Sequence, residues 1–102
     1  MNKTKLKKLK KKLEAYRQSP QGRKRSSLVS IAKQLGRERV DTGKEPTYVN
    51  KDHPEWVPLS IPGHPGDVKV GTCCRIIDAL LSDIDEWEIA LNQSDEAGND
   101  KD

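Results

Sequence analysis

Apolar residues recur every three or four positions in three stretches of the chain, which is the spacing of one helix face. Residues 3–17 carry a narrow apolar stripe in a lysine-rich background, at Leu6, Leu9, Leu13 and Tyr16. A second stripe precedes Gly36, at Leu28, Ile31, Ala32 and Leu35, and Ser26 or Ser27 is suited to cap its helix. The longest stripe follows Thr72, a candidate cap, at Ile76, Ile77, Leu80, Leu81, Ile84, Trp87 and Leu91. The pattern predicts three helices, of which the last contributes most to the core.

Shorter runs of β-favouring residues lie between the second and third helices. Residues 37–40 are predicted as a short first strand, residues 47–50 as a second, and residues 55–61 as a third that ends at Pro62. The short connection between the last two strands favours an antiparallel hairpin. The order helix, helix, two or three strands, helix predicts an α+β domain, with a small antiparallel sheet covered on one face by helices.

The length and composition of the chain allow one small domain. It has 102 residues, 32% of them hydrophobic, and no Phe, so the core is expected to be thin. Residues 1–18 are predicted as a basic N-terminal helix and residues 19–92 as the α+β domain. Residues 93–102 lack apolar periodicity and are predicted as a disordered acidic tail.

Charge is distributed unevenly along the sequence, although the net charge is only +3. From Met1 to Arg39 there are 14 Lys or Arg residues and two acidic residues, whereas from Ile76 to Asp102 there are nine acidic residues and one Lys. The first part is suited to attract a polyanion, and the last part would repel one. The simpler interpretation is that these charges are solvated or attract one another; the acidic end could also bind a basic partner or cover the lysine-rich helix.

No apolar run is long enough to cross a membrane, and no membrane partner is expected. Cys73 and Cys74 are adjacent and cannot readily form a disulfide with each other on a helix, so a reducing cytoplasm fits best. His53, His64 and the two cysteines do not have the spacing of a zinc site. No nucleotide-binding fingerprint is present, and no cofactor or metal is predicted.

The connection from the third strand to the last helix contains the most suggestive chemistry. Residues 62–67 hold two prolines, two glycines and His64. An imidazole on such a restricted loop could act as a general acid or base, or it could hydrogen-bond a backbone carbonyl and hold the loop in shape. His53, beside Pro54 in a turn, is expected to be exposed and without a role.

Residues 27–81 resemble the HicA family of toxins from bacterial toxin–antitoxin pairs. The residues that carry the resemblance are Leu28, Ile31, Leu35, Gly36, Gly43, Ile61-Pro62-Gly63-His64-Pro65, Val68, Gly71-Thr72 and Ile76. The resemblance implies a fold similar to double-stranded RNA-binding domains, cleavage of mRNA as an endoribonuclease, and neutralisation by a cognate antitoxin protein. It also implies that His64 belongs to the functional loop.

The chain departs from the family at the start of the second strand. Family members have a Gly-Ser-His type of sequence there, with the histidine implicated in RNA cleavage, whereas this chain reads Gly43-Lys44-Glu45-Pro46. On this alignment Glu45 takes the place of the histidine and could accept a proton from a ribose 2′-hydroxyl, while Lys44 could stabilise charge on the phosphate. Both residues could equally be solvated turn residues without a role.

The basic residues define a predicted RNA-binding face. Its members are Lys7, Lys8, Lys11, Arg23, Lys24, Arg25, Lys33 and Arg37. We expect contacts mainly with phosphates, because an A-form duplex hides its base edges in a deep groove. Tyr48 and Trp56 are candidate stacking platforms, with core packing as the alternative. An RNA-binding toxin is therefore one hypothesis, and a non-catalytic module that binds nucleic acid or protein is the other.

Overall fold

The computed structural model describes residues 2–41, 46–63 and 66–99. Its helices are α1 (Lys3–Gln18), α2 (Arg25–Gln34) and α3 (Val70–Asn99), and its strands are β1 (Glu38–Asp41), β2 (Pro46–Val49) and β3 (Leu59–Ser60). The strands form one antiparallel sheet in the order β1-β2-β3. The predicted α+β class and the predicted β2–β3 hairpin are confirmed.

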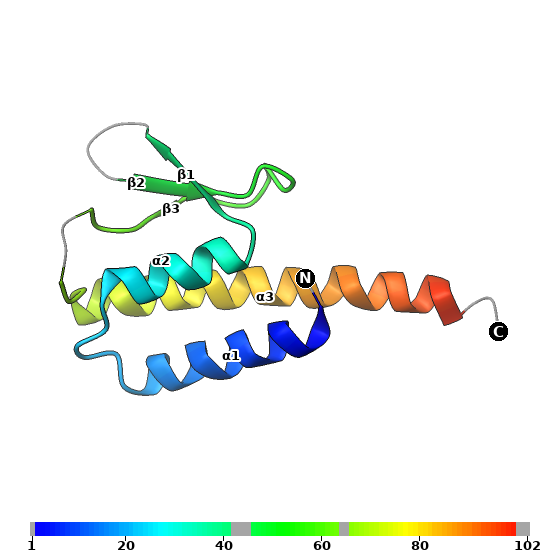
Figure 1. Ribbon diagram of the computed structural model, residues 1–102, viewed down its shortest axis with the longest axis horizontal. Helices are drawn as coiled ribbons and strands as arrows, with labels where there is room; N and C mark the ends of the chain where they lie inside the picture. The colour runs from blue at the N-terminus through cyan, green and yellow to red at the C-terminus, as the bar shows by residue number, and fades with distance from the viewer. Residues whose placement is uncertain (1, 42–45, 64–65, 100–102) are drawn as a thin grey trace.

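The helices lie in two layers beside the sheet. Figure 1 shows the sheet on one side of α2 and α3 and α1 on the other side. Tyr48, Leu59 and Ile61 of the sheet region are buried, while Thr47 and Ser60 on the alternate positions are more exposed. Helices therefore cover one face of the sheet, as the strand pattern predicts.

The apolar stripe of α1 is part of the same core as the rest of the protein. Leu6, Leu9 and Leu13 are at most 5% exposed and belong to one cluster with the buried residues of α2 and α3. α1 runs antiparallel to α3, and its first residues lie beside Leu91 and Asn92. The lysine-rich helix is thus attached to the domain by its leucines.

The end of α2 follows the sequence prediction closely. Gly36 has φ +97°, a conformation in which a side chain is strained, and an added Cβ would lie 2.9 Å from Nδ2 of Asn50. The N–H of Arg37 donates to the carbonyl of Ala32 at 3.0 Å, and the N–H of Gly36 donates to that of Lys33 at 3.0 Å. This pair of hydrogen bonds is a Schellman motif, which satisfies the last carbonyls of the helix.

The starts of α2 and α3 were predicted wrongly. The N-cap of α2 is Lys24, without a side-chain cap bond, so Ser26 and Ser27 lie inside the first turn. The N–H of Arg25 is instead satisfied by the carbonyl of Gly66 at 3.2 Å. Thr72 also lies inside its helix, because α3 begins at Val70. In α2, pairing with a distant loop replaces the local cap that the sequence suggested.

The third strand is much shorter than predicted. Residues 55–57 belong to a turn region, in which the N–H of Trp56 donates to the carbonyl of His53 at 3.0 Å. The carbonyl of Val57 accepts a hydrogen bond from the Arg37 guanidinium at 3.1 Å. Only Leu59 and Ser60 pair with β2.

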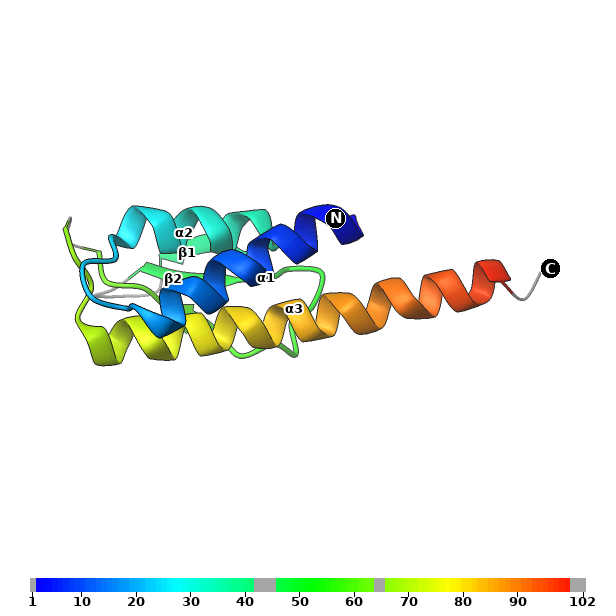
Figure 2. The same cartoon turned by 90° about the horizontal axis from the view of Figure 1, so that it is seen from below.

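Helix α3 continues past the predicted end at Asn92, through Asn99. Residues 93–99 contain no proline, so nothing in their sequence breaks the helical backbone before Gly98. Figure 2 shows that this end of α3 projects beyond the start of α1. The backbone therefore runs away from the lysine-rich helix as far as Asn99 and does not fold back over it. None of the helices in the described part of the chain is long and apolar enough to span a membrane.

Candidate nucleic-acid interface

The three catalytic candidates, His64, Glu45 and Lys44, lie outside the described residues. Their described neighbours Gly63 and Pro46 are in contact, because an added Cβ at Gly63 would lie 3.0 Å from Cδ of Pro46. The N–H of Ile61 also donates to the carbonyl of Pro46 at 3.2 Å. The structure thus brings together the flanks of the two segments that contain the candidates.

A basic turn is hydrogen-bonded to the loop that contains His64. Nε of Arg25 donates to the carbonyl of Pro62 at 2.6 Å, and its backbone N–H donates to the carbonyl of Gly66 at 3.2 Å. The N–H of Val68 donates to the carbonyl of Arg23 at 2.8 Å. Arg25 therefore binds both described ends of the loop and fixes the distance between them.

Two helix N-termini point toward the same end of the molecule. α2 begins at Arg25 and α3 at Val70, both on the left in Figure 1, and neither has an acidic residue in its first turn. The positive ends of the helix dipoles thus add to the side-chain charges. We call this region the basic end and define it by Arg23, Lys24, Arg25 and Lys69.

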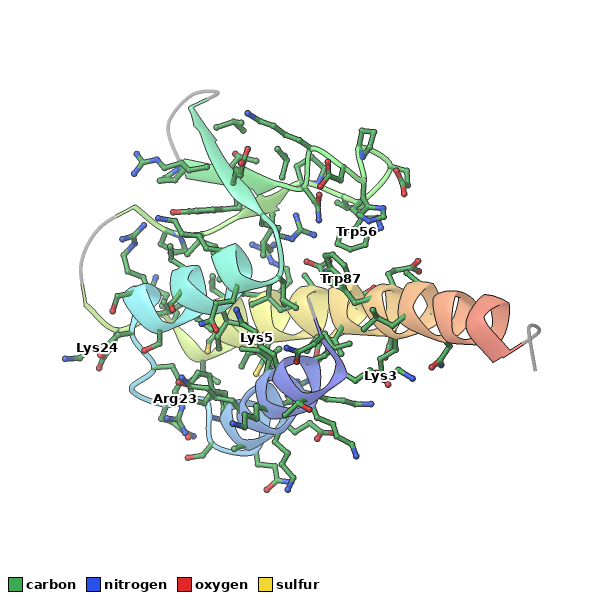
Figure 3. The ribbon with its side chains drawn as sticks, turned by 45° about the vertical axis from the view of Figure 1, so that its right-hand side comes forward. Lys3, Lys5, Arg23, Lys24, Trp56 and Trp87 are labelled. Carbon is green, nitrogen blue, oxygen red and sulfur yellow. The ribbon has the colours of Figure 1, made fainter. Side chains whose placement is uncertain are left out.

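Lys24 and Lys69 are exposed at the basic end, whereas Arg23 and Arg25 are half-buried. Figure 3 shows Arg23 and Lys24 projecting from the connection between α1 and α2. The Arg23 guanidinium lies 4.2 Å from the centre of the Tyr16 ring, and its Nε donates to the carbonyl of Ser19 at 3.0 Å. Asp67 is an acidic residue in the described part of this region, and its backbone bridges to that of Lys24. The described charges of the basic end are mainly positive, which favours an anionic ligand.

The lysines of α1 that were predicted to bind RNA are available to solvent. Lys7, Lys8 and Lys11 are exposed, as is Lys33 on α2. Lys10 is different, because its Nζ lies 3.3 Å from Oε1 of Glu88 on α3. This hydrogen bond and ion pair raise the pKa of Lys10. Lys7, Lys8 and Lys11 thus add exposed positive charge on α1, and Lys33 adds it on α2, outside the basic end.

Arg37 is not part of this surface, and its assignment to the RNA-binding face was wrong. The residue is 3% exposed, and its Nε and Nη2 donate to the two carboxylate oxygens of Asp83 at 2.6 and 2.9 Å. Its Nη1 donates to the carbonyls of Tyr48 and Val57 at 2.8 and 3.1 Å. Each nitrogen of the guanidinium is used inside the protein, so Arg37 cannot bind a phosphate without breaking the fold.

The two aromatic candidates for base stacking, Tyr48 and Trp56, do not form an open stacking surface. Tyr48 is 1% exposed and belongs to the core. The Trp56 ring is stacked on His53, with ring centres 4.4 Å apart, and meets Trp87 edge-on. One face of Trp56 is therefore already covered. Nδ1 of His53 lies 3.3 Å from Oε1 of Glu55, and the side chain is 34% exposed. His53 is half-buried in this cluster rather than isolated in a turn.

The surroundings of Cys73 and Cys74 do not favour a reactive thiolate at Cys73 or an open thiol at Cys74. Burial raises the pKa of the Cys73 thiol, as does the neighbouring thiol of Cys74, whereas Arg23 lowers it. Cys74 is half-buried, and its Sγ accepts a hydrogen bond from Nη1 of Arg17 at 3.3 Å. Within residues 2–41, 46–63 and 66–99, no group of three or more His, Cys, Asp or Glu residues is arranged to hold a metal ion.

Sequence reasoning missed two features of this region. The role of Arg25 depends on one hydrogen bond to the carbonyl of Pro62, 37 residues away, and no spacing rule signals such a contact. The aromatic cluster of His53, Trp56 and Trp87 joins the turn before β3 to the last helix. The sequence shows that both tryptophans lie in apolar segments, but it does not show that the two segments meet. Comparisons of the chain with protein-family models, with curated proteins and with solved structures gave no match.

Proposed function

We propose that the protein binds RNA through the basic end and the exposed lysines of α1. The observation that supports this most strongly is the attachment of the basic turn to both described ends of the loop that contains His64. Phosphates attracted to Lys24 and Lys69 would then lie beside that loop. Two helix N-termini at the same end strengthen the attraction for phosphate oxygens.

The resemblance to HicA toxins extends this proposal to cleavage of mRNA. In that reaction the ribose 2′-hydroxyl attacks the adjacent phosphorus, and the Glu45 carboxylate accepts the hydroxyl proton. The His64 imidazolium donates a proton to the departing 5′-oxygen, and Lys44 stabilises the charge on the phosphate. The products are a 2′,3′-cyclic phosphate and a 5′-hydroxyl, and no metal ion takes part.

The test of cleavage is incubation of the purified protein with mRNA in excess chelator. Fragments with 2′,3′-cyclic phosphate ends are expected, and single His64→Ala and Glu45→Ala variants should produce at least about 100-fold less, since one general acid or base contributes about 10²–10⁴-fold. His53→Ala is the matched control and should cleave at the wild-type rate. Intact RNA at high protein concentration would exclude RNA cleavage by this protein. RNA binding would then be tested separately.

A non-catalytic interaction module is the second candidate function. It is favoured by the sequence Gly43-Lys44-Glu45-Pro46, which lacks the histidine that the family uses for cleavage. A non-catalytic module would bind RNA with an affinity that falls steeply as salt rises, and it would leave the RNA intact. Growth arrest on expression that is relieved by Glu45→Ala or His64→Ala would contradict this second function.

A cognate antitoxin is the protein partner that the resemblance implies. Such a partner would cover the basic end and present acidic side chains to Lys24 and Lys69. A small open reading frame adjacent to the gene, encoding a DNA-binding segment, would support this part of the proposal.

A further inference from the structure

A groove runs between helix α3 and the chain that leads into β3. Its volume is about 610 Å³, and one wall is formed by residues 55–60, which include Trp56 and Val57. The other wall is one stripe of α3, made of Arg75, Ala79, Ser82 and Glu86. Val57 is 78% exposed, which is unusual for a valine at a rim, and Arg75, Ser82 and Glu86 are exposed as well. The groove faces solvent and has an apolar edge.

Strand addition is a poor way to fill this groove. β3 is an edge strand, and the bond from Ile61 to Pro46 shows that Leu59 and Ile61 direct their backbone groups toward β2. The backbone groups of residues 58, 60 and 62 therefore point away from the sheet. Two of these residues are Pro58 and Pro62, which have no N–H, so Ser60 alone offers a donor at this edge. Prolines at such positions hinder pairing with another strand.

The helix wall has a self-complementary arrangement of charge and size. Ala79 and Ser82 are small residues at its centre, and Arg75 and Glu86 lie four residues outside them on either side. Neither Arg75 nor Glu86 has an ion pair within the described part of the chain. A two-fold axis through the midpoint between Ala79 and Ser82 would place Arg75 of one copy opposite Glu86 of another, and the reverse. A two-fold interface requires this reciprocity.

We propose that this stripe of α3 is the interface of a homodimer in which two α3 helices pack antiparallel. Ala79 and Ser82 allow the helix backbones to approach closely, and two reciprocal Arg75–Glu86 pairs flank the centre. Ile89 is 52% exposed, and the same axis places it against Thr72 in the first helical turn of the second copy.

The direction of the two helices fits the same arrangement. The axis places the backbone at Asn92 of one copy opposite Lys69 of the other, just before the second α3 begins at Val70. The dipoles of the two antiparallel helices then run in opposite directions, which favours their packing side by side. This inference does not depend on the proposed function.

The test is a charge-reversal series measured by sedimentation equilibrium. The wild type is expected to dimerise reversibly, and Arg75→Glu and Glu86→Arg should each raise the dimer dissociation constant by about tenfold or more. Each single reversal creates two like-charge contacts across the axis. The double variant Arg75→Glu/Glu86→Arg should regain most of the wild-type affinity. A mixture of the two single variants should form a heterodimer, because both pairs of side chains that face each other across the axis are then again of opposite charge.

The control is Lys12→Glu on α1, which reverses one charge outside the groove and should leave the dimer unchanged. A wild type that stays monomeric up to roughly 1 mM, which corresponds to less than about 4 kcal/mol of association free energy, overturns the proposal. A dimer that both single reversals leave intact also overturns it, since that dimer would use another surface. Circular dichroism of each variant confirms that loss of the dimer is not loss of the fold.

Discussion

At the scale of single residues, the fold depends most visibly on the Arg37–Asp83 pair. Arg37 lies at the junction of α2 and β1, and its guanidinium contacts α3 through Asp83, β2 through Tyr48 and the β3 connection through Val57. Both charged side chains are at most 5% exposed. Two ions removed from water are tolerated because their hydrogen bonds are satisfied by each other and by backbone carbonyls. The pair therefore links α3, β2 and the connection to β3 through one buried guanidinium.

Asp83→Asn should destabilise the protein strongly, because it leaves the Arg37 charge buried without a counterion. The expected loss is about 3–5 kcal/mol of unfolding free energy, measured by urea denaturation. The control is Asp78→Asn, which breaks the exposed pair with Arg17 at 3.0 Å and should change little. The combined Arg37→Met/Asp83→Leu variant should recover much of the stability. An Asp83→Asn protein as stable as wild type would contradict the role assigned to the pair.

The sequence predicted the exposure of the lysines in the functional region correctly, but it misplaced the buried Arg37. Lys7, Lys8, Lys11, Lys24 and Lys33 are exposed as expected, because a lysine without a buried partner remains in solvent. Arg37 was misassigned because its partner Asp83 is 46 residues away in sequence, and a count of charges cannot distinguish a buried arginine from a surface one. The roles of His64, Glu45 and Lys44 stay predictions, since all three lie outside the described residues.

At the scale of elements, α1 is held to the protein by its leucines rather than by its charges. Leu13 is fully buried, and Leu6 and Leu9 are nearly so, whereas the ion pair between Lys10 and Glu88 is exposed on both sides. Burial of apolar side chains contributes far more than exposed ion pairs. Lys7, Lys8 and Lys11 are exposed and can therefore contact a ligand while the leucines maintain the position of the helix.

Leu13→Ala should lower the unfolding free energy by about 2–5 kcal/mol, because it removes buried methyl groups and leaves a cavity between α1 and α3. Chemical denaturation followed by circular dichroism measures the change. Lys12→Ala, one position earlier and exposed, is the matched control and should behave like wild type. Equal stability of the Leu13→Ala and Lys12→Ala proteins would mean that α1 is not packed as described.

Helical periodicity predicted the helices well, and local signals predicted their ends less well. The end of α2 at Gly36 could be predicted because it depends on the backbone freedom of one residue. The start of α2 could not, because the carbonyl of Gly66 replaces a serine cap. β3 is shorter than its apolar pattern, since a turn around His53 and the hydrogen bond to Val57 take up the residues before it. These contacts are tertiary and leave no periodic signal.

At the scale of the whole molecule, the basic end and the acidic sequence of α3 lie at opposite ends of the longest axis, which measures 51 Å. The lysine-rich start of α1 lies between them, beside Leu91 and Asn92. The basic end lies at the start of α2 and α3, and the acidic sequence of α3 extends from the opposite end (Figures 1 and 2). A polyanion would therefore approach the basic end and α1 and be repelled from the far end of α3. This polarity could be inferred from the sequence, but the attachment of the basic turn to the His64 loop could not.

The most direct test of RNA binding is the salt dependence of RNA affinity for the wild type and an Arg23→Ala/Lys24→Ala variant. A Lys51→Ala variant is the control, because Lys51 lies near Glu38 of β1, outside the basic end. Each phosphate contact contributes about 0.7–0.9 to the slope of log affinity against log salt. We predict a shallower slope for the double variant, by about 1.4–1.8, and no change for the control. Equal slopes for all three proteins, or no RNA binding by the wild type at low salt, would contradict the proposed interface.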